Sequence, residues 1–533
     1  MRYLKFSIID RRKNPEKSKR PPRDQTDLPV FLISVICCTC FYAPMVIFKD
    51  AAANIIPPLL TVVTNSMDWC FELIPFSCLI FSLWLMFGRY GKVVLGGKEA
   101  KPQFSTFTWI ALIFCAGVGA GIIYWACIEP MSYISAPPFG VAPFSDAARN
   151  WALTYTCFHW SITPWAIYAI PSVIFAYKFY NRNCGGLRAS YACSGALGKH
   201  AQGFWGKVID IFVIIGLLGG LATSLGFVFP FISGLIANYL DIADGLYLQV
   251  IVGLGFTGIF LLSCIRGLYS GISTLSNINM VLFIGLVLFI LLSGPTLWLI
   301  SFFVESMGAM AQNYLQMSFY MDKVGNSRFP QNWTVFYWAW QVSWSIYIGL
   351  FTARISKGRT IRSLVIAIIL VAGCGTGLIC AVIGGYTQYV IYDLGVDLFA
   401  LADTAGNIGA VYYMLSSLPF AEVFIPLMVL ILLIAQATGI DSAAYTLSNI
   451  SCKKVKQEGE PPLFLRLFWS LGIFLAALAT IVVGGGESVK ISAVLTSIPI
   501  LLLLVVFMVS LYHWLREDDK VKHKSFKRPT NKN

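Results

Sequence analysis

Charged residues are scarce in this chain. Only 12% of its 533 residues are charged, whereas soluble domains carry about 25%. Hydrophobic residues make up 57% of the sequence, and the mean hydropathy is +0.71. Such a composition leaves almost no room for an aqueous domain and predicts a polytopic membrane protein. A signal peptide is not expected either, because the first apolar run follows a long charged segment and therefore looks like a retained span.

Other shortages limit the possible functions. The sequence has no nucleophile–base set, no metal-ligand spacing and no nucleic-acid motif, so neither an enzyme nor a nucleic-acid partner is expected. Most of the 14 cysteines lie inside apolar runs, so they do not indicate an oxidising compartment. Cys37, Cys38 and Cys40 form a CCxC pattern, but inside a lipid-facing helix, where we do not expect a metal site.

The excess of positive charge lies mainly in the two tails. The net charge is +13; residues 1–27 hold nine Lys/Arg against four Asp/Glu, and residues 516–533 hold seven against three. Basic segments beside membrane spans suit the anionic cytoplasmic leaflet. We therefore expect a basic N-terminal tail (1–27), a membrane domain (28–515) and a basic C-terminal tail (516–533), with both tails contacting anionic lipid.

The hydrophobic runs predict twelve spans of about 20 residues or more each. Basic loops alternate with acidic or neutral ones, which is the positive-inside pattern and places both termini in the cytoplasm. Residues 301–325 are too polar for a span and too periodic for a plain loop, so an amphipathic helix on the outer surface is expected there. The predicted spans are 28–48, 67–88, 107–129, 148–176, 208–238, 247–265, 279–300, 334–353, 363–388, 419–447, 464–484 and 491–513.

An aromatic stripe marks the eighth predicted span. At 3.6 residues per turn, Trp340, Ser343, Trp344 and Tyr347 share one face of the helix. Aromatic faces attract cations, and quaternary ammonium groups are bound in aromatic cages. Taken alone, the stripe is better explained by lipid-facing or packing aromatics, so it indicates a cation site only if other helices supply further walls.

The fourth predicted span supplies a second aromatic cluster. Pro164 lacks the N–H that would bond to the carbonyl of Trp160, so the helix should kink there. Trp160, Trp165 and Tyr168 surround that point. His159, beside them, is either a packed neutral histidine or a proton relay.

The third predicted span contains Gly117, Gly119 and Gly121 in alternation. A glycine in a helix interior costs about 1 kcal/mol relative to alanine, so three suggest either an unwound segment lining a cavity or tight small-residue packing. Hydroxyls at Thr223, Ser224 and Thr438 offer oxygen ligands for a hard cation such as Na⁺, although such residues also serve helix packing. Glu72, Glu129 and Asp441 are charges within spans, which mark function or pairing.

Taken together, these motifs resemble the betaine/choline/carnitine transporter family, a family of secondary transporters of methylated amines. The resemblance covers about residues 28–515. It is most specific at FPQNWTVFYWAW (329–340), SW (343–344), ARISKGRTIR (353–362), FHW…PWAIY (158–168), EP…PPFG (129–140) and LSNINM (275–280).

The resemblance implies an all-α fold of twelve transmembrane helices, in which spans 3–7 and 8–12 form a leucine-transporter-type inverted repeat after two preceding helices. It also implies a homotrimer to which the external amphipathic helix contributes. The methylated ammonium group would lie in a box between spans four and eight. The substrate-binding residues expected on this basis are Trp160, Trp165, Tyr168, Trp340, Gln341, Ser343 and Trp344.

The chain departs from the family pattern at two substrate positions. Where the family commonly has two adjacent tryptophans, this chain has Trp340–Gln341, which replaces an aromatic wall with an amide. Choline-type members tend to carry an aspartate in the glycine motif, and GVGAG (117–121) has none. Choline is therefore not the expected main substrate.

Coupling to sodium is favoured by two neutral positions. Exchangers of the carnitine type have an arginine in span seven and a methionine late in span eight, and the matching residues here are Asn279 and Ile348. Against this, Gly439 replaces a serine that coupled members usually have. The sodium ligands expected by resemblance are Cys115, Val118, Thr223, Ser224, Tyr347 and Thr438, with backbone oxygens near Cys115 and Val118.

The sequence thus predicts a sodium-coupled importer of a small methylated ammonium compound, such as glycine betaine, carnitine or trimethylamine, working by alternating access in a bacterial inner membrane. No cofactor is expected besides sodium as the coupling ion. Two alternatives stay open: a sodium-independent precursor/product antiporter of the carnitine/γ-butyrobetaine type, and an osmosensing amine-binding protein.

Overall fold

The computed structural model describes residues 26–182, 186, 188–266, 272–453, 461–484 and 486–526. In these ranges the regular secondary structure is helical, apart from two isolated β-bridges, and loops and turns connect the helices. The main helices are α2 (Leu28–Ile47), α3 (Lys49–Phe87), α4 (Thr106–Gly117), α5 (Gly121–Ser135), α6 (Asp146–Trp160), α7 (Ile162–Tyr177), α8 (Ser194–Leu197), α9 (Phe204–Leu240), α10 (Leu246–Arg266), α11 (Ile272–Ser293), α12 (Thr296–Ser318), α13 (Phe329–Asn332), α14 (Thr334–Ile355), α15 (Ile361–Val365), α16 (Gly373–Tyr392), α17 (Leu398–Ser416), α18 (Ala421–Ile450), α19 (Leu463–Val483) and α20 (Gly486–Phe526).

The number of spans is confirmed only in part. Within the described residues, six helices are long and apolar enough to cross a membrane, or up to eight if each of two bent pairs counts as one span. Each of the twelve predicted spans falls on one helix or on consecutive helices. The interior helix α14 is not among the apolar candidates, because its Trp, Tyr, Ser and Gln side chains lower its hydropathy. Twelve spans and the inverted repeat therefore stay predictions.

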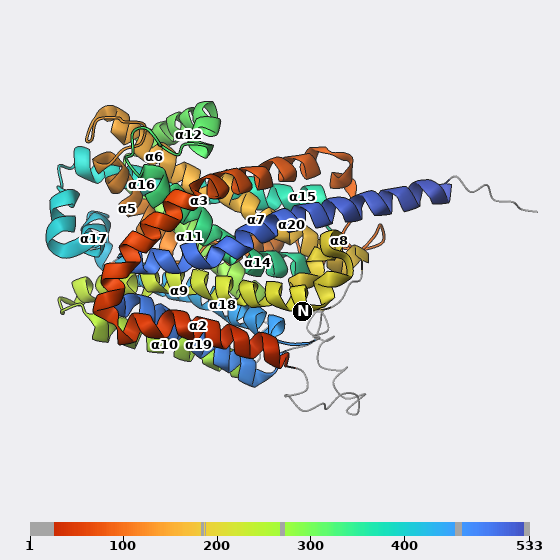
Figure 1. Ribbon diagram of the computed structural model, residues 1–533. Coiled ribbons are helices and arrows are strands. Elements are labelled where there is room, and N and C mark those ends of the chain that lie inside the picture. Colours follow the sequence, from red (N-terminus) through yellow and green to blue (C-terminus); the bar gives the residue numbers. More distant parts are fainter. Residues whose placement is uncertain are drawn as a thin grey trace, which may run out of the picture.

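Three regions differ from the predicted boundaries. Helix α3 begins at Lys49 rather than at residue 67 and continues through Pro57 and Pro58. The predicted fourth span consists of two helices, α6 and α7, separated by Ser161. The predicted external amphipathic helix (301–325) corresponds mostly to α12, which follows α11 after a bend of 111°. In Figure 1, α12 lies at the edge of the bundle beside α6.

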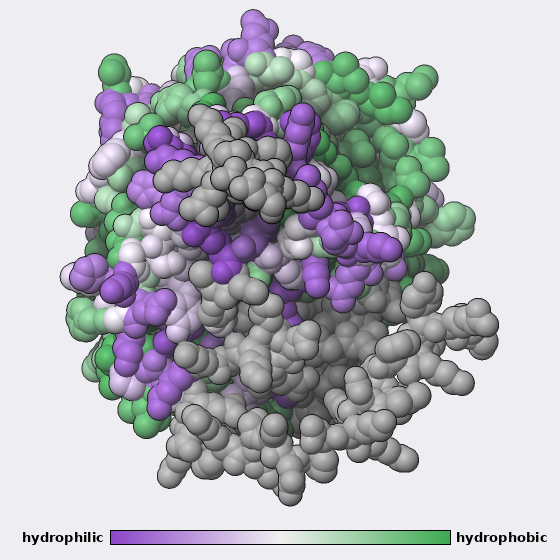
Figure 2. Space-filling model, turned by 90° about the vertical axis from the view of Figure 1, so that its right-hand side faces the viewer, coloured by the Kyte–Doolittle hydropathy of each residue, from purple (hydrophilic) through white to green (hydrophobic). Residues whose placement is uncertain are grey.

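Helix α20 is the longest described helix. At 1.5 Å per residue, its 41 residues extend about 60 Å, twice the roughly 30 Å of a bilayer's hydrocarbon core. It crosses the bundle and projects from one end (Figure 1). There, Glu517 and Asp518 pair with Arg182 at 2.9 and 3.0 Å, and Asp519 pairs with Arg89 at 2.9 Å. Seen from this end, many hydrophilic residues gather near the middle, and apolar residues predominate at the upper right of the rim (Figure 2).

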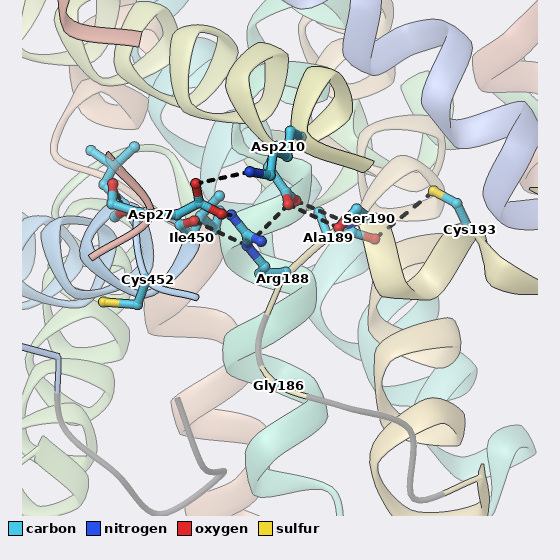
Figure 3. A network of polar contacts seen from close by, with 12 residues as sticks. Asp27, Gly186, Arg188, Ala189, Ser190, Cys193, Asp210, Ile450 and Cys452 are labelled. Carbon is cyan, nitrogen blue, oxygen red and sulfur yellow. Dashed lines mark hydrogen bonds and ion pairs between the residues drawn. The ribbon is translucent and has the colours of Figure 1, made fainter. Parts of the chain in front are cut away.

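A buried ion network ties together four segments near the same end (Figure 3). Arg188 Nη2 lies 2.8 Å from Asp27 Oδ2, just before α2, and its Nε lies 3.1 Å from Asp210 Oδ2 in α9. The Arg188 Nε also donates to the carbonyl of Ile450, the last residue of α18, at 3.4 Å. Asp210 accepts both the backbone N–H and the hydroxyl of Ser190. Residues 1–25 of the predicted N-terminal tail lie outside the described residues.

Candidate functional site

The site is built around a break between α4 and α5. Helix α4 ends at Gly117, α5 begins at Gly121, and their axes differ by 61°. The break is so tightly packed that a side chain would not fit at either glycine. A Cβ at Gly117 would lie 2.5 Å from the Trp165 ring, and one at Gly119 would lie 2.9 Å from Gln436 Oε1. The unwinding predicted from the glycine pattern is therefore confirmed, and close packing accompanies it.

A second break, between α6 and α7, faces the first. Ser161 has non-helical dihedral angles (φ −96°, ψ −106°), three residues before Pro164. The proline has no N–H for the carbonyl of Trp160, and that carbonyl instead accepts the hydroxyl of Thr376 in α16. A neighbouring helix thus supplies the hydrogen bond that the proline removes, as is usual for broken helices within membranes. The predicted kink is confirmed.

A cavity of about 40 Å³ lies between these breaks and α14. It exceeds the roughly 10–15 Å³ that one water molecule requires. Five of the predicted substrate-binding residues line it, together with glycines of the α4–α5 break. The lining residues are Gly117, Gly119, Gly121, Ile122, Trp160, Tyr168, Ser224, Val228, Trp340, Gln341, Trp344 and Gln436.

The indoles at this cavity are fixed through their N–H groups. Trp340 and Trp344 donate to the same atom, Ser224 Oγ, at 2.8 and 3.0 Å. Trp160 donates to Glu129 Oε1 at 2.6 Å. The rings of Trp160 and Trp340 are nearly perpendicular (82°), with centroids 6.1 Å apart. Two π faces held at this angle form a corner in which a cation can contact both rings within the usual 6 Å.

Glu129 is the buried acceptor behind Trp160. Besides that indole, it accepts the hydroxyls of Tyr133 (3.0 Å) and Tyr337, and its side chain is fully buried. His159 Nδ1 lies 2.9 Å from the Tyr133 hydroxyl, and its Nε2 lies 3.1 Å from the Thr334 hydroxyl. Both ring nitrogens are thus paired within a structural network. This favours a packed histidine over a proton relay.

Two predicted substrate-binding residues lie behind the cavity wall. Trp165 donates its indole N–H to Thr376 Oγ1 at 2.9 Å and packs against Gly117. Ser343 donates to the carbonyl of Trp340 at 2.6 Å and packs against Gly220 of α9. Neither residue is among those that line the cavity. Their positions support the walls formed by other residues.

The hydroxyls predicted to bind sodium differ in their hydrogen-bond partners. Thr223 donates to the carbonyl of Val489 at 2.9 Å and is fully buried. Ser224 donates to the carbonyl of Gly220 at 3.0 Å while it accepts the two indoles, so its hydrogen-bonding capacity is filled. The side chain of Thr438 lies outside the described residues.

The remaining predicted sodium ligands are distributed around the α4 end and α14. Cys115 Sγ accepts Asn279 Nδ2 at 3.8 Å. Val118 directly follows α4, and its N–H donates to the carbonyl of Phe114 at 3.0 Å. The Tyr347 ring packs edge-on against Trp344, with centroids 5.6 Å apart. The sodium site stays a prediction.

Sequence reasoning missed the part that Gln436 and Thr376 play. Gln436 lies two residues before Thr438, lines the cavity, and accepts the backbone N–H of Ala120 in the α4–α5 break. Thr376 lies in a GCGTG run (373–377). This run does not indicate a role at the α6–α7 break, because the partners of Thr376 there, Trp160 and Trp165, are in other helices.

A comparison of the sequence with protein-family models matches residues 29–520 to the family described as betaine/carnitine/choline family transporter. The match covers both helix breaks, the cavity and all the candidate site residues.

Proposed function

Because the chain belongs to the betaine/carnitine/choline transporter family, it is a multi-pass membrane transporter rather than an enzyme, and we propose that it imports a small methylated ammonium compound. Glycine betaine, carnitine and trimethylamine are the candidate substrates. The observation that carries this proposal is the corner formed by Trp160 and Trp340 beside Trp344 at the α4–α5 break. Each cation–π contact contributes about 0.5–2 kcal/mol, so several faces supply much of the roughly −4 to −8 kcal/mol of a millimolar to micromolar ligand.

Replacing one wall tests the location of the site. Trp344→Ala should weaken binding of glycine betaine by about tenfold or more, because it removes one π face and one partner of Ser224. Isothermal titration of the purified protein measures this change. Near wild-type affinity in the variant would place the ammonium site elsewhere.

Sodium symport with alternating access is the mechanism we favour. It is supported by the neutral Asn279, which is buried beside Cys115, and by the hydroxyl of Thr223 in α9, which donates to the carbonyl of Val489 and whose oxygen lone pairs can bind a cation. Uptake into proteoliposomes should require an inward sodium gradient, and equal uptake with and without the gradient would refute coupling. Gly439 favours the alternative, sodium-independent exchange, which predicts uptake only into vesicles preloaded with a related amine.

Assembly and membrane orientation complete the proposal. Helix α12 packs against α6 and α16 and leaves Leu297, Val304 and Leu315 exposed (81%, 63% and 63%), which favours a contact between subunits of a homotrimer. The basic tails favour cytoplasmic termini that contact anionic lipid in a bacterial inner membrane. An osmosensing role would instead depend on the C-terminal tail, and deleting residues 516–533 should then abolish osmotic activation.

A further inference from the structure

Two buried glutamines line the cavity in addition to its aromatic walls. Gln341 of α14 is 7% exposed and Gln436 of α18 is 2% exposed. Both contribute to the lining. Burying an amide costs free energy unless its polar atoms find partners, so two amides in one small apolar cavity call for an explanation.

The oxygen of each amide already has a donor inside the protein. Gln436 Oε1 accepts the backbone N–H of Ala120 at 3.0 Å. Because a backbone N–H pairs only with an acceptor, this bond fixes the orientation of the amide. Gln341 Oε1 accepts the hydroxyl of Tyr168. Among the described residues, neither amide nitrogen has an acceptor.

The other side-chain donors of the lining are engaged. The indole N–H groups of Trp160, Trp340 and Trp344 bind Glu129 and Ser224. The Ser224 hydroxyl itself donates to the carbonyl of Gly220. The two NH₂ groups are therefore the side-chain donors that the described lining leaves for a ligand.

The charges of the lining restrict what that ligand can be. No carboxylate or basic side chain is among the lining residues of the described cavity. A lone cation buried there would lack a counter-charge, and an unpaired buried charge is costly. A zwitterion supplies its own counter-charge, and its carboxylate accepts hydrogen bonds from neutral amides.

We infer that Gln341 and Gln436 are specificity-determining residues, whose NH₂ groups bind the carboxylate of a methylated ammonium zwitterion. This inference rests on the proposed function and assigns the residues that select its substrate. A hydroxyl in place of the carboxylate fits less well, because it offers the two amide N–H groups a neutral acceptor, and a hydrogen bond to a charged oxygen is roughly twice as strong. Each glutamine acts here as a specificity-determining residue.

The test compares two probes that share one cationic group. Glycine betaine carries a carboxylate, whereas tetramethylammonium does not. The variants are Gln436→Glu and Gln341→Glu, which keep the acceptor oxygen for Ala120 or Tyr168 and replace the donating NH₂ by a charged oxygen. Gln312→Glu, at an exposed position of α12, adds the same charge away from the cavity and serves as the control.

Binding is measured by isothermal titration of the full-length purified protein, with thermal melting to confirm folding. Wild type should prefer glycine betaine. Each cavity variant should weaken glycine betaine binding by about tenfold or more, since hydrogen bonds to charged groups are lost, and should retain or strengthen binding of tetramethylammonium. Gln312→Glu should match wild type for both probes.

Three results overturn the inference: equal affinity of the wild type for the two probes, equal weakening of both probes in the folded variants, or unchanged glycine betaine binding. In all three the wild type still binds a methylated cation, so the proposed function stands. Wild type that binds neither probe refutes the proposed function itself. If one variant does not fold, the other decides by the same criteria.

Discussion

Ser224 offers the most direct test of how the aromatic walls are positioned. In Ser224→Ala, Trp344 retains the carbonyl of Gly220 at 3.3 Å, but the Trp340 indole loses its acceptor. An unsatisfied buried donor costs about 1–3 kcal/mol, so the indole should leave its present orientation. The ligand then loses up to one cation–π contact of about 0.5–2 kcal/mol, which corresponds to a 2- to 30-fold weaker Kd at about 1.4 kcal/mol per tenfold change.

Isothermal titration with glycine betaine at saturating sodium measures this effect. Ser233→Ala is the matched control, because Ser233 lies on the same helix and its hydroxyl contacts Pro230 and Asp244 outside the cavity. The control should keep the wild-type Kd. An unchanged Kd in Ser224→Ala together with an altered sodium dependence would refute the reasoning and identify Ser224 as a sodium ligand instead.

Three further predictions concern packing and buried polar groups, each measured by thermal or chemical unfolding. Arg188→Met should destabilise the protein by about 3–5 kcal/mol, because Asp27 and Asp210 lose their shared cation; adding Asp210→Asn should recover part of the loss, and no recovery would contradict the pairing. Thr376→Val should cost about 1–3 kcal/mol, because the carbonyl of Trp160 and the indole of Trp165 both lose their partner; a neutral result would show that the α6–α7 break does not need it. Gly349→Ala should cost about 1–3 kcal/mol by overpacking, because its Cβ would lie 2.5 Å from Pro171 Cβ; wild-type stability would mean that α7 and α14 separate easily.

Much of the site could be predicted because its signals are local in the sequence. Alternating glycines and Pro164 indicated both helix breaks, and helical periodicity placed Trp340 and Trp344 on one face. Contacts between distant segments could not be predicted in this way. Trp165 and Ser343 lie behind the cavity wall because α16 packs closely against Trp165 and α9 against Ser343. The sequence of one helix does not show how closely another helix packs against it.

Apolar periodicity also had limited power for the helix count and boundaries. Helix α3 begins well before the predicted span. The prediction missed this start because the first part of the helix includes prolines and polar residues that are typical of loops. Helix α14 is almost entirely buried, yet it carries the polar and aromatic groups of the site. The helices closest to the function are thus the ones that hydropathy identifies least well.

The absence of carboxylate and basic side chains from the described cavity lining has an electrical consequence. A membrane potential of 100 mV acts with about 2.3 kcal/mol on each elementary charge that crosses. A zwitterion carries no net charge, and a lining of this kind adds none when it moves between the two faces. The potential would then act only on the co-transported ions, so the charge moved per substrate molecule would report their number directly.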